Sequence, residues 1–317
     1  MVKRVLGIVC IVCVATVSSA TGQVATAEDP VVSTSQTVHY YTYSWEGDRF
    51  EDGRPRVSDA LLDRVKNIKL EDAWQYLNEL GYPNQYEGGW EMLHEDQPMV
   101  GRVLTAQYMP DRKAVSERVT EDGHDAGHVG PMNSWPIDLL QEGDIYLADS
   151  FGKIDGGTLI GSNLGTSIFS RSQNGVIFNG SSRDEEDLED IEGFNALVRQ
   201  WHPSFLVETM LTGINVPVRI GGVTVMPGDV ALAKKGGVVF IPPHLVEEIV
   251  ITAEIVSLRD EFGQMRMREG VYSAGQIDTR WTGEIEQDFL NWLRENRLDE
   301  LPVSIEQMQQ FLQQRTW

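Results

Sequence analysis

Short apolar runs recur along the middle of this chain, and glycine-rich turns or helical patterns separate them. Runs of four to seven apolar residues bounded by turn residues are typical of buried β-strands. They lie at 100–106, 144–149, 175–180, 230–233 and 237–241, with a hairpin around a Gly-Gly pair at 216–225. Helices are predicted between some of them, at 70–80 closed by Gly81, at 161–173, and from near Arg183. Strands that alternate with helices predict an α/β domain.

The first residues have the pattern of a secretory signal peptide. Lys3 and Arg4 precede an apolar run at 5–15, and small residues at 17–20 offer a cleavage site, with a second possible site after Ala27. The alternative is a membrane anchor, for which the apolar run is short. We therefore expect export to the periplasm or the medium, with no membrane association after cleavage.

The two cysteines of the chain, Cys10 and Cys13, both lie in this leader. The mature chain is then expected to form no disulfide and to use neither a thiolate nucleophile nor a Cys-ligated zinc. Its formal net charge is −22. A charge this negative argues against binding to phosphate backbones, so no nucleic-acid partner is expected.

Four segments are predicted from these patterns. Residues 1–27 form the signal peptide, 28–56 a polar N-terminal extension, 57–257 the α/β domain, and 258–317 a C-terminal helical extension. Within the domain, residues 110–134 are expected to be a loop. The extension carries apolar stripes at helical spacing, and Ser304 with Gln307 resembles a capping box. We expect these stripes to pack on the domain or on a neighbouring subunit.

The stretch 156–187 carries the most chemical information. A glycine-rich turn leads into a helix at Gly161-Ser162-Asn163-Leu164, and free amides at such a helix start can hold a carboxylate or phosphate. The next strand ends at Arg183-Asp184. Arginine offers a two-pronged contact to a carboxylate, and an aspartate can bind Mg²⁺ with water in the other positions. An Arg-Asp pair is also a common surface ion pair or helix cap, and both interpretations stay open at this point.

Several motifs in the same order resemble the RraA-like family over residues 57–257. They are Val100-Gly101-Arg102 with Thr105, Glu142-Gly143-Asp144, Arg183-Asp184 with Asp187, Pro217-Val218 with Met226-Pro227-Gly228-Asp229, and Gly237-Val238 with Ile241-Pro242. The family includes metal-dependent 4-hydroxy-4-methyl-2-oxoglutarate aldolases with oxaloacetate decarboxylase activity. It also includes RraA regulators that bind an endoribonuclease, and proteins labelled dimethylmenaquinone methyltransferases. The resemblance implies a ββαβ swivelling domain, here with N-terminal and C-terminal extensions, assembled as a homotrimer or homohexamer.

The resemblance also implies roles for individual residues. The amides of Gly161, Ser162, Asn163 and Leu164 would hold the substrate carboxylate, Arg183 would contact the carbonyl and carboxylate end of a small 2-keto acid, and Asp184 would bind Mg²⁺ or Mn²⁺. The metal would polarise the keto oxygen and stabilise the pyruvate enolate. Two positions depart from the family pattern. Ser162 stands where the aldolases carry an acid that organises metal-bound water, and Lys234 replaces a common Asp.

Two functions therefore remain as hypotheses. One is a metal-dependent lyase of the class II aldolase or decarboxylase type, and the other is a non-catalytic RraA-like binding or regulatory protein outside the cytoplasm. Weaker site candidates are His124 and His128 as metal ligands, Glu185, Glu186 and Asp187 in the outer shell of the metal, and Lys153 or Lys234 as a Schiff-base lysine. No Gly-x-Gly-x-x-Gly loop follows a strand, which argues against a Rossmann-type methyl-donor site.

Overall fold

The fold is known from a computed structural model that describes residues 29–314, so the predicted signal peptide lies outside the described part. The chain enters through α1 (Ser35–Tyr41), whose first turn is capped by the Thr34 hydroxyl. An irregular segment follows, and then come α2 (Asp59–Val65) and α3 (Leu70–Glu79). Gly81, with φ of 87°, ends α3 in the left-handed conformation that glycine allows.

A nine-stranded mixed sheet forms the centre of the molecule, in the order β1-β11-β10-β3-β4-β5-β6-β2, with β7 also paired to β3. Strands β3 to β6 run parallel to one another, and the other pairings are antiparallel. The strand bounds are β1 Tyr86–Glu87, β2 Glu91–Met92, β3 Met99–Pro110, β4 Asp144–Asp149, β5 Val176–Ser182, β6 Ala196–Trp201, β7 Thr209–Ile214, β10 Val230–Lys234 and β11 Gly237–Ile241.

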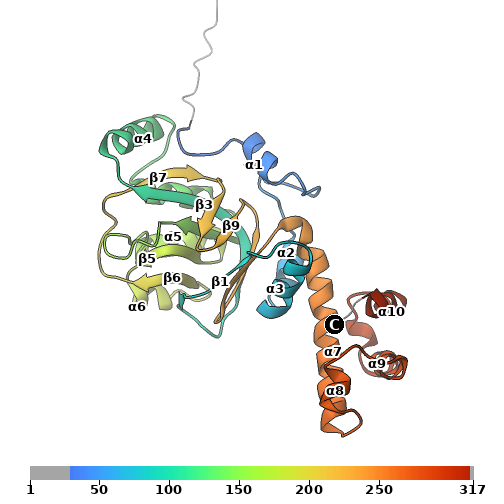
Figure 1. Cartoon of the computed structure of the whole chain (residues 1–317). Coiled ribbons are helices and arrows are strands. Elements are labelled where there is room, and N and C mark those ends of the chain that lie inside the picture. The colour runs from blue at the N-terminus through green and yellow to red at the C-terminus, as the bar shows by residue number, and fades with distance from the viewer. Residues whose placement is uncertain (1–28, 315–317) are drawn as a thin grey trace, which may run out of the picture.

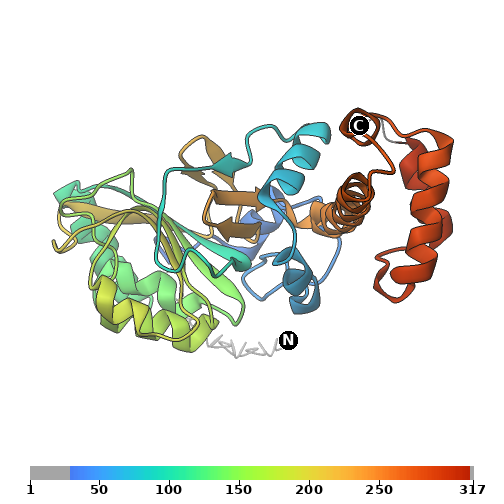
Figure 2. The ribbon, with the colours of Figure 1, turned by 90° about the horizontal axis from the view of Figure 1, so that it is seen from below.

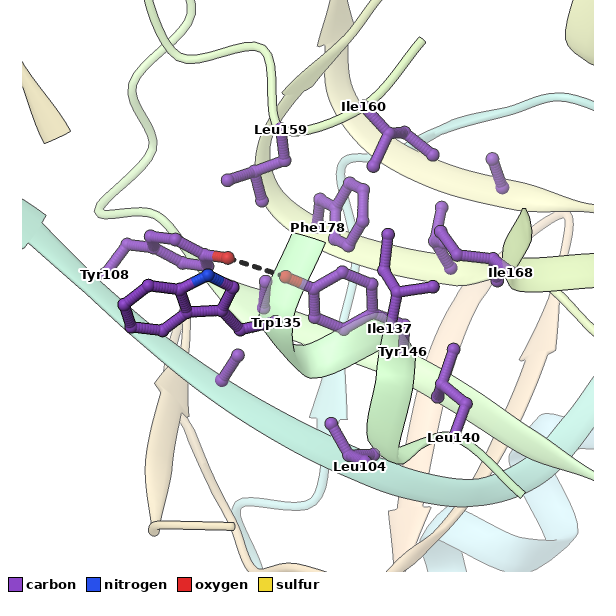
Figure 3. Packing of buried hydrophobic residues seen from close by; sticks show 14 of the residues in the cluster. Leu104, Tyr108, Trp135, Ile137, Leu140, Tyr146, Leu159, Ile160, Ile168 and Phe178 are labelled. Atoms are coloured by element: carbon purple, nitrogen blue, oxygen red, sulfur yellow. Dashed lines mark hydrogen bonds between the residues drawn. The ribbon is translucent and has the colours of Figure 1, made fainter. Parts of the chain in front are cut away.

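One face of the parallel strands is covered by α5 (Ser162–Ser172), α6 (Glu185–Glu189) and the 3₁₀ helix η1 (Met132–Leu139). Side chains alternate across each strand, so Phe178 points into this layer while Ile177 points to the opposite face. Figure 3 shows Leu159 and Ile160, which precede α5, packed beside Phe178 in this core. The hydroxyls of Tyr108 and Tyr146 lie 2.7 Å apart here, so each buried phenol has a partner.

The opposite face is closed by the hairpin of β8 (Val218–Ile220) and β9 (Val223–Val225), as predicted around Gly221-Gly222. Near β10 and β11, helices α2, α3 and the first part of α7 (Val246–Arg268) pack in a second core, after the short 3₁₀ helix η2 (Pro243–Leu245). The α/β fold with extra helical segments at both ends confirms the predicted fold class.

The second half of α7 extends away from the sheet, and the C-terminal helices lie beside it (Figures 1 and 2). These are α8 (Ala274–Ile277), α9 (Gly283–Asn296), the 3₁₀ helix η3 (Leu298–Glu300) and α10 (Ile305–Gln314). They share a core of their own with α7, centred on Phe262, Phe289 and Trp292. Ser304 and Gln307 form the predicted capping box. Because α7 is continuous, the boundary predicted between the domain and the C-terminal extension, at residues 257 and 258, lies within one helix.

A buried arginine holds the N-terminal extension against the domain. Arg54 is fully buried, and its guanidinium contacts Asp52 at 2.7 Å and Asp144, the first residue of β4, at 2.8 Å. A charge in this position is stable only while it is paired, so truncation of either partner would cost about 3–5 kcal/mol. The extension is therefore part of the folded body.

Two predictions about local structure were wrong. The expected loop at 110–134 contains α4 (Lys113–Asp125), whose side chains are mostly exposed and which projects from the sheet in Figure 1. Because little of α4 is buried, its sequence has no apolar stripe to indicate a helix. Strands β6 and β7, together with the short β1 and β2, were also missed. No helix in the described residues is long and apolar enough to cross a membrane.

Candidate functional site

The Arg183-Asp184 pair lies at the carboxyl edge of the parallel strands, where β5 ends at Ser182. Open α/β sheets bind ligands at this edge. Asp184 adopts the left-handed conformation, with φ of 59° and ψ of 43°, and α6 begins at the next residue. This backbone turn directs the carboxylate toward the start of α5, which follows β4 in the chain.

The Asp184 carboxylate contacts the first turn of α5. Its Oδ2 accepts the Ser162 amide proton at 3.0 Å, and the Ser162 hydroxyl lies 3.5 Å away. A carboxylate at a helix start is stabilised by the free amides and by the helix dipole. Oδ1 of Asp184 makes no hydrogen bond to any part of the chain that the structure describes, so it is available to a ligand.

Gly161 makes this close approach possible. A Cβ atom at position 161 would lie 2.3 Å from Asp184 Oδ2 and 3.0 Å from Arg183 Nε. The backbone of Gly161, at φ −132° and ψ −165°, is extended and open to any residue. Glycine is therefore required here by the position of the Asp184 side chain, and not by the backbone conformation.

Two further amides of α5 face the same space. The first four amides of a helix have no partner within it, and here Ser162 donates to Asp184 while Gly165 donates to the Gly161 carbonyl at 2.9 Å. Among residues 29–314 neither the Asn163 amide nor the Leu164 amide has a hydrogen-bond acceptor. These two N–H groups are therefore available to a ligand, whereas the Ser162 amide, which was predicted to hold the substrate with them, is occupied by Asp184. That the loop holds a carboxylate stays a prediction.

The guanidinium of Arg183 lies beside the same carboxylate. Its Nε is 3.9 Å from Asp184 Oδ2, and its Cζ lies 5.0 Å from the centre of the Phe205 ring. The Arg183 side chain is 36% exposed, and its backbone amide donates to the Ile160 carbonyl at 3.2 Å. The ring and the backbone bond hold the residue in place, while the exposed guanidinium keeps donors free for a ligand.

A pocket of about 410 Å³ joins these groups. Its walls come from four segments that are separate in sequence, and the lining residues are Pro131, Asn133, 158–164, Arg183, Asp184, Phe205 and Leu206. Leu159 and Ile160 belong both to this lining and to the buried core, where Figure 3 shows them. The sequence analysis found the 161–164 and 183–184 segments and missed Asn133, Phe205 and Leu206. Nothing in their local sequence marks them, because they reach the pocket through η1 and the turn after the missed strand β6.

The donor set can be compared with the needs of Mg²⁺. Asp184 supplies the one carboxylate among the described residues that line the pocket, and its Oδ1 is free. Mg²⁺ is commonly held by one or two carboxylates with waters and substrate oxygens in the remaining positions. The site therefore fits a water-rich Mg²⁺ or Mn²⁺. No cluster of three or more His, Cys, Asp or Glu side chains occurs within 29–314 to form a cage of protein ligands.

The acidic residues that follow Asp184 do not line the pocket. Glu185 and Glu186 belong to α6 and are exposed, and Asp187 is on the same helix. Burial and the nearby Glu91, Glu189 and Glu186 raise the pKa of Glu185. These side chains form an acidic helix face, and the outer-shell role considered for them has no support in this geometry.

The other candidates have separate structural roles. His128 pairs with Asp29 at 2.7 Å and stacks on Trp135, while His124 bonds to the Gly130 carbonyl, so the two form no metal site in this part of the fold. Lys153 donates to the Val207 carbonyl. Burial lowers the pKa of Lys234, the other Schiff-base candidate, and this side chain donates to the Ile68 carbonyl outside the pocket.

The fold and site together define an α/β protein with unpaired amides at a helix start and a single carboxylate beside them, at one edge of the sheet. The family model of RraA-like proteins, described as Aldolase/RraA, matches residues 55–240. The chain belongs to the RraA-like family.

Three known proteins show the range of its relatives. The 4-hydroxy-4-methyl-2-oxoglutarate aldolase of Thermus thermophilus is 26% identical over 143 residues, covering 45% of this chain and 74% of that protein. Protein DlpA of Legionella pneumophila is 25% identical over 230 residues, which cover 69% of this chain and only 32% of that protein. Streptomyces coelicolor RraAS2, a member of the RNase ES inhibitor RraA family, matches in structure with a TM-score of 0.57 at 25% identity, over 67% of this chain and all of that one.

Proposed function

We propose that this protein is a divalent-metal-dependent lyase that cleaves a C–C bond in a small 2-keto acid. The observation that carries the proposal is the convergence of four groups on one pocket. These are the Arg183 guanidinium, the Asp184 carboxylate, and the free amides of Asn163 and Leu164. A site with two anion-binding elements beside one metal-binding carboxylate suits a dianionic keto acid.

Each residue has a distinct role in this proposal. The amides of Asn163 and Leu164 hold the carboxylate next to the keto group, and Arg183 donates to the keto oxygen and to that carboxylate. Phe205 and Leu206 line one side of the pocket and place apolar surface beside the reacting bond. Asp184 holds Mg²⁺ or Mn²⁺ through Oδ1. When bound, the metal supplies a positive charge that polarises the keto oxygen and offsets the negative charge developing there.

The absence of a second acid-base group on this pocket favours decarboxylation over aldol cleavage. Aldol cleavage requires a base to remove a proton from the substrate hydroxyl, and Ser162 occupies the position where the family's aldolases carry an acid. Decarboxylation of a 3-carboxyl 2-keto acid such as oxaloacetate needs no such base. The bond to the leaving CO₂ breaks, its electron pair moves toward the keto oxygen, and water then protonates the adjacent carbon to give pyruvate.

The test measures pyruvate release from oxaloacetate and from 4-hydroxy-4-methyl-2-oxoglutarate, with Mg²⁺, with Mn²⁺, and with excess chelator. A no-enzyme arm at the same metal concentration corrects for decarboxylation by free metal. We expect metal-dependent turnover of oxaloacetate that exceeds turnover of the hydroxy acid. Keto-acid and metal binding by calorimetry with no turnover of either substrate would instead support the non-catalytic binding protein.

We also propose that the protein is exported and that it assembles as a homotrimer or homohexamer. The leader at 1–27 supports export. Exposed apolar side chains support assembly, because Phe205, which lines the pocket, is 69% exposed, and Val129, two residues before the lining residue Pro131, is 77% exposed. A neighbouring subunit that covered them would also narrow the entrance of the pocket.

A further inference from the structure

A second pocket lies between the N-terminal extension and the domain, at a place separate from the keto-acid site. It has a volume of about 300 Å³, near the lower end for small-molecule sites. Its lining combines the extension residues 41–45 with Tyr82, Gln85, Thr224, Met226, Asp229 and the turn 242–244. It shares no lining residue with the Arg183-Asp184 pocket.

Aromatic rings make up much of this lining. Tyr41, Tyr43 and Trp45 come from the extension and Tyr82 from the domain. The extension wall is fixed by Arg49, whose guanidinium donates to the Thr42 hydroxyl at 2.7 Å, the Thr42 carbonyl at 2.8 Å and the Trp45 carbonyl at 3.0 Å. A wall held by several charge-assisted bonds keeps its position without a ligand, which lowers the entropic cost of binding.

A buried carboxylate lines the same pocket. Asp229 is 3% exposed, and its Oδ2 accepts the Met226 amide proton at 2.9 Å. Within the described residues, Oδ1 accepts no hydrogen bond and no cationic side chain pairs with the carboxylate. An ionised carboxylate that is buried without a cation is costly, so a positive ligand would gain from both the charge and the rings.

We propose that this aromatic pocket binds a small organic cation of the alkylated ammonium class, with the rings of Tyr41, Tyr43, Trp45 and Tyr82 around its methyl groups and Asp229 as its counter-ion. Recognition of alkylated ammonium groups by several aromatic faces and one carboxylate is a well-founded physical arrangement. The other ionisable side chains of the lining are His244 and the tyrosines. Burial lowers the pKa of His244, so this side chain is neutral at pH 7.5 and does not compete with the ligand.

The protonation of Asp229 should make cation binding depend on pH. Burial raises the pKa of the Asp229 carboxyl to about 7, while the bond from the Met226 amide opposes this change. A cation binds the ionised form, so it must displace a proton near neutral pH. The apparent affinity should therefore rise as the pH increases from 6 to 8, and proton release should appear as a binding enthalpy that depends on the buffer.

The experiment is titration calorimetry on the purified protein with choline and with its neutral carbon isostere 3,3-dimethyl-1-butanol, at pH 6 and pH 8. At pH 8 we expect choline to bind at least about tenfold more tightly than the isostere. Choline should bind more weakly at pH 6 than at pH 8. Tyr41→Ala should weaken choline binding about tenfold, while Tyr41→Phe, which keeps the ring, should not. Tyr86→Ala is a matched control, because Tyr86 is 42% exposed against 39% for Tyr41 and lies outside the pocket.

Asp229→Asn keeps an acceptor for the Met226 amide and removes the charge. We expect this variant to melt cooperatively, to lose choline binding, and to lose the difference between pH 6 and pH 8. Equal affinities for choline and the neutral isostere would overturn the proposal in favour of a plain apolar pocket. Absence of choline binding by the wild type at about 10 mM ligand would overturn the proposal as well, because such a cage is expected to have a Kd below this concentration.

Discussion

Substitution of Gly161 by alanine tests the site geometry without removing any functional group. The added Cβ would lie 2.3 Å from Asp184 Oδ2, where ordinary contact between carbon and oxygen is about 3.4 Å. Because the backbone at Gly161 is extended, alanine introduces no backbone strain. The carboxylate must therefore move by about 1 Å, and its bond to the Ser162 amide must break or lengthen.

The Gly161→Ala substitution should reduce activity much more than it reduces stability. A displacement of about 1 Å in a reacting or metal-binding group costs about 100-fold in rate. The loss to stability should be smaller, about 1 kcal/mol, because Asp184 is one-third exposed and water replaces the lost bond. For a chain of this size that corresponds to a change in Tm of about 2 °C.

The assay pairs metal-dependent oxaloacetate decarboxylation with Mn²⁺ titration and thermal melting. Gly283→Ala is the control, since Gly283 also begins a helix, has no positive φ, and has nothing within 4 Å of an added Cβ. We expect Gly161→Ala to lose activity and Mn²⁺ affinity while its Tm stays close to that of the control. If Gly161→Ala keeps wild-type Mn²⁺ affinity and turnover, the carboxylate of Asp184 is not the metal ligand.

Five further outcomes are expected. Asp184→Asn should abolish Mn²⁺ binding measured by calorimetry and leave the melting curve unchanged. Arg183→Lys should raise KM for oxaloacetate about tenfold or more, because an ammonium group cannot make the two-pronged contact. Ser162→Asp should increase aldol cleavage relative to decarboxylation, measured as the ratio of pyruvate released from the two substrates, because it restores an acid beside the metal position. The free energy of unfolding should fall as the pH rises from 4 to 7. In the folded protein the Asp229 carboxyl, with a pKa of about 7, holds a proton that it releases in the unfolded chain near its usual pKa of 3.8. Denaturant melts of Asp229→Asn should lack this contribution, which is up to about 4 kcal/mol. Light scattering of the purified protein should give three or six times the mass of one chain, and a mass near 35.5 kDa would contradict the proposed assembly.

Strands were predicted from the sequence where their side chains are buried on both faces of the sheet. β4, β5, β10 and β11 are almost entirely buried, so their sequences are continuous apolar runs and were found from composition alone. β6 is buried only over its first half and then continues through Arg199 and Gln200 to Trp201. Such a mixed pattern matches neither a buried strand nor a clean alternation, and a single sequence gives no means to recognise it.

The candidate site was predictable only in part. The helix start at Gly161 and the pair Arg183-Asp184 could be found because each has a local signal, a glycine before a helix or a charge pair after a strand. Phe205 approaches Arg183 through tertiary folding alone, and no local sequence signal indicates the left-handed backbone that directs the Asp184 carboxylate to Ser162. The aromatic pocket could not be predicted, since the segment containing Tyr41 and the turn containing Asp229 meet only in the folded chain.

The charge on Asp184 has no sufficient explanation in the stability of the fold. An asparagine would tolerate the left-handed backbone equally well, and its side-chain oxygen could accept the same Ser162 amide proton. The ion pair with Arg183 spans 3.9 Å between side chains that are each about one-third exposed, so it contributes less than about 1 kcal/mol. The left-handed conformation of a non-glycine residue itself costs about 1 kcal/mol. A strained position that carries a carboxylate with one free oxygen, beside a pocket lined by amide donors, supports the proposal that a cation binds in that pocket and takes part in a metal-dependent reaction.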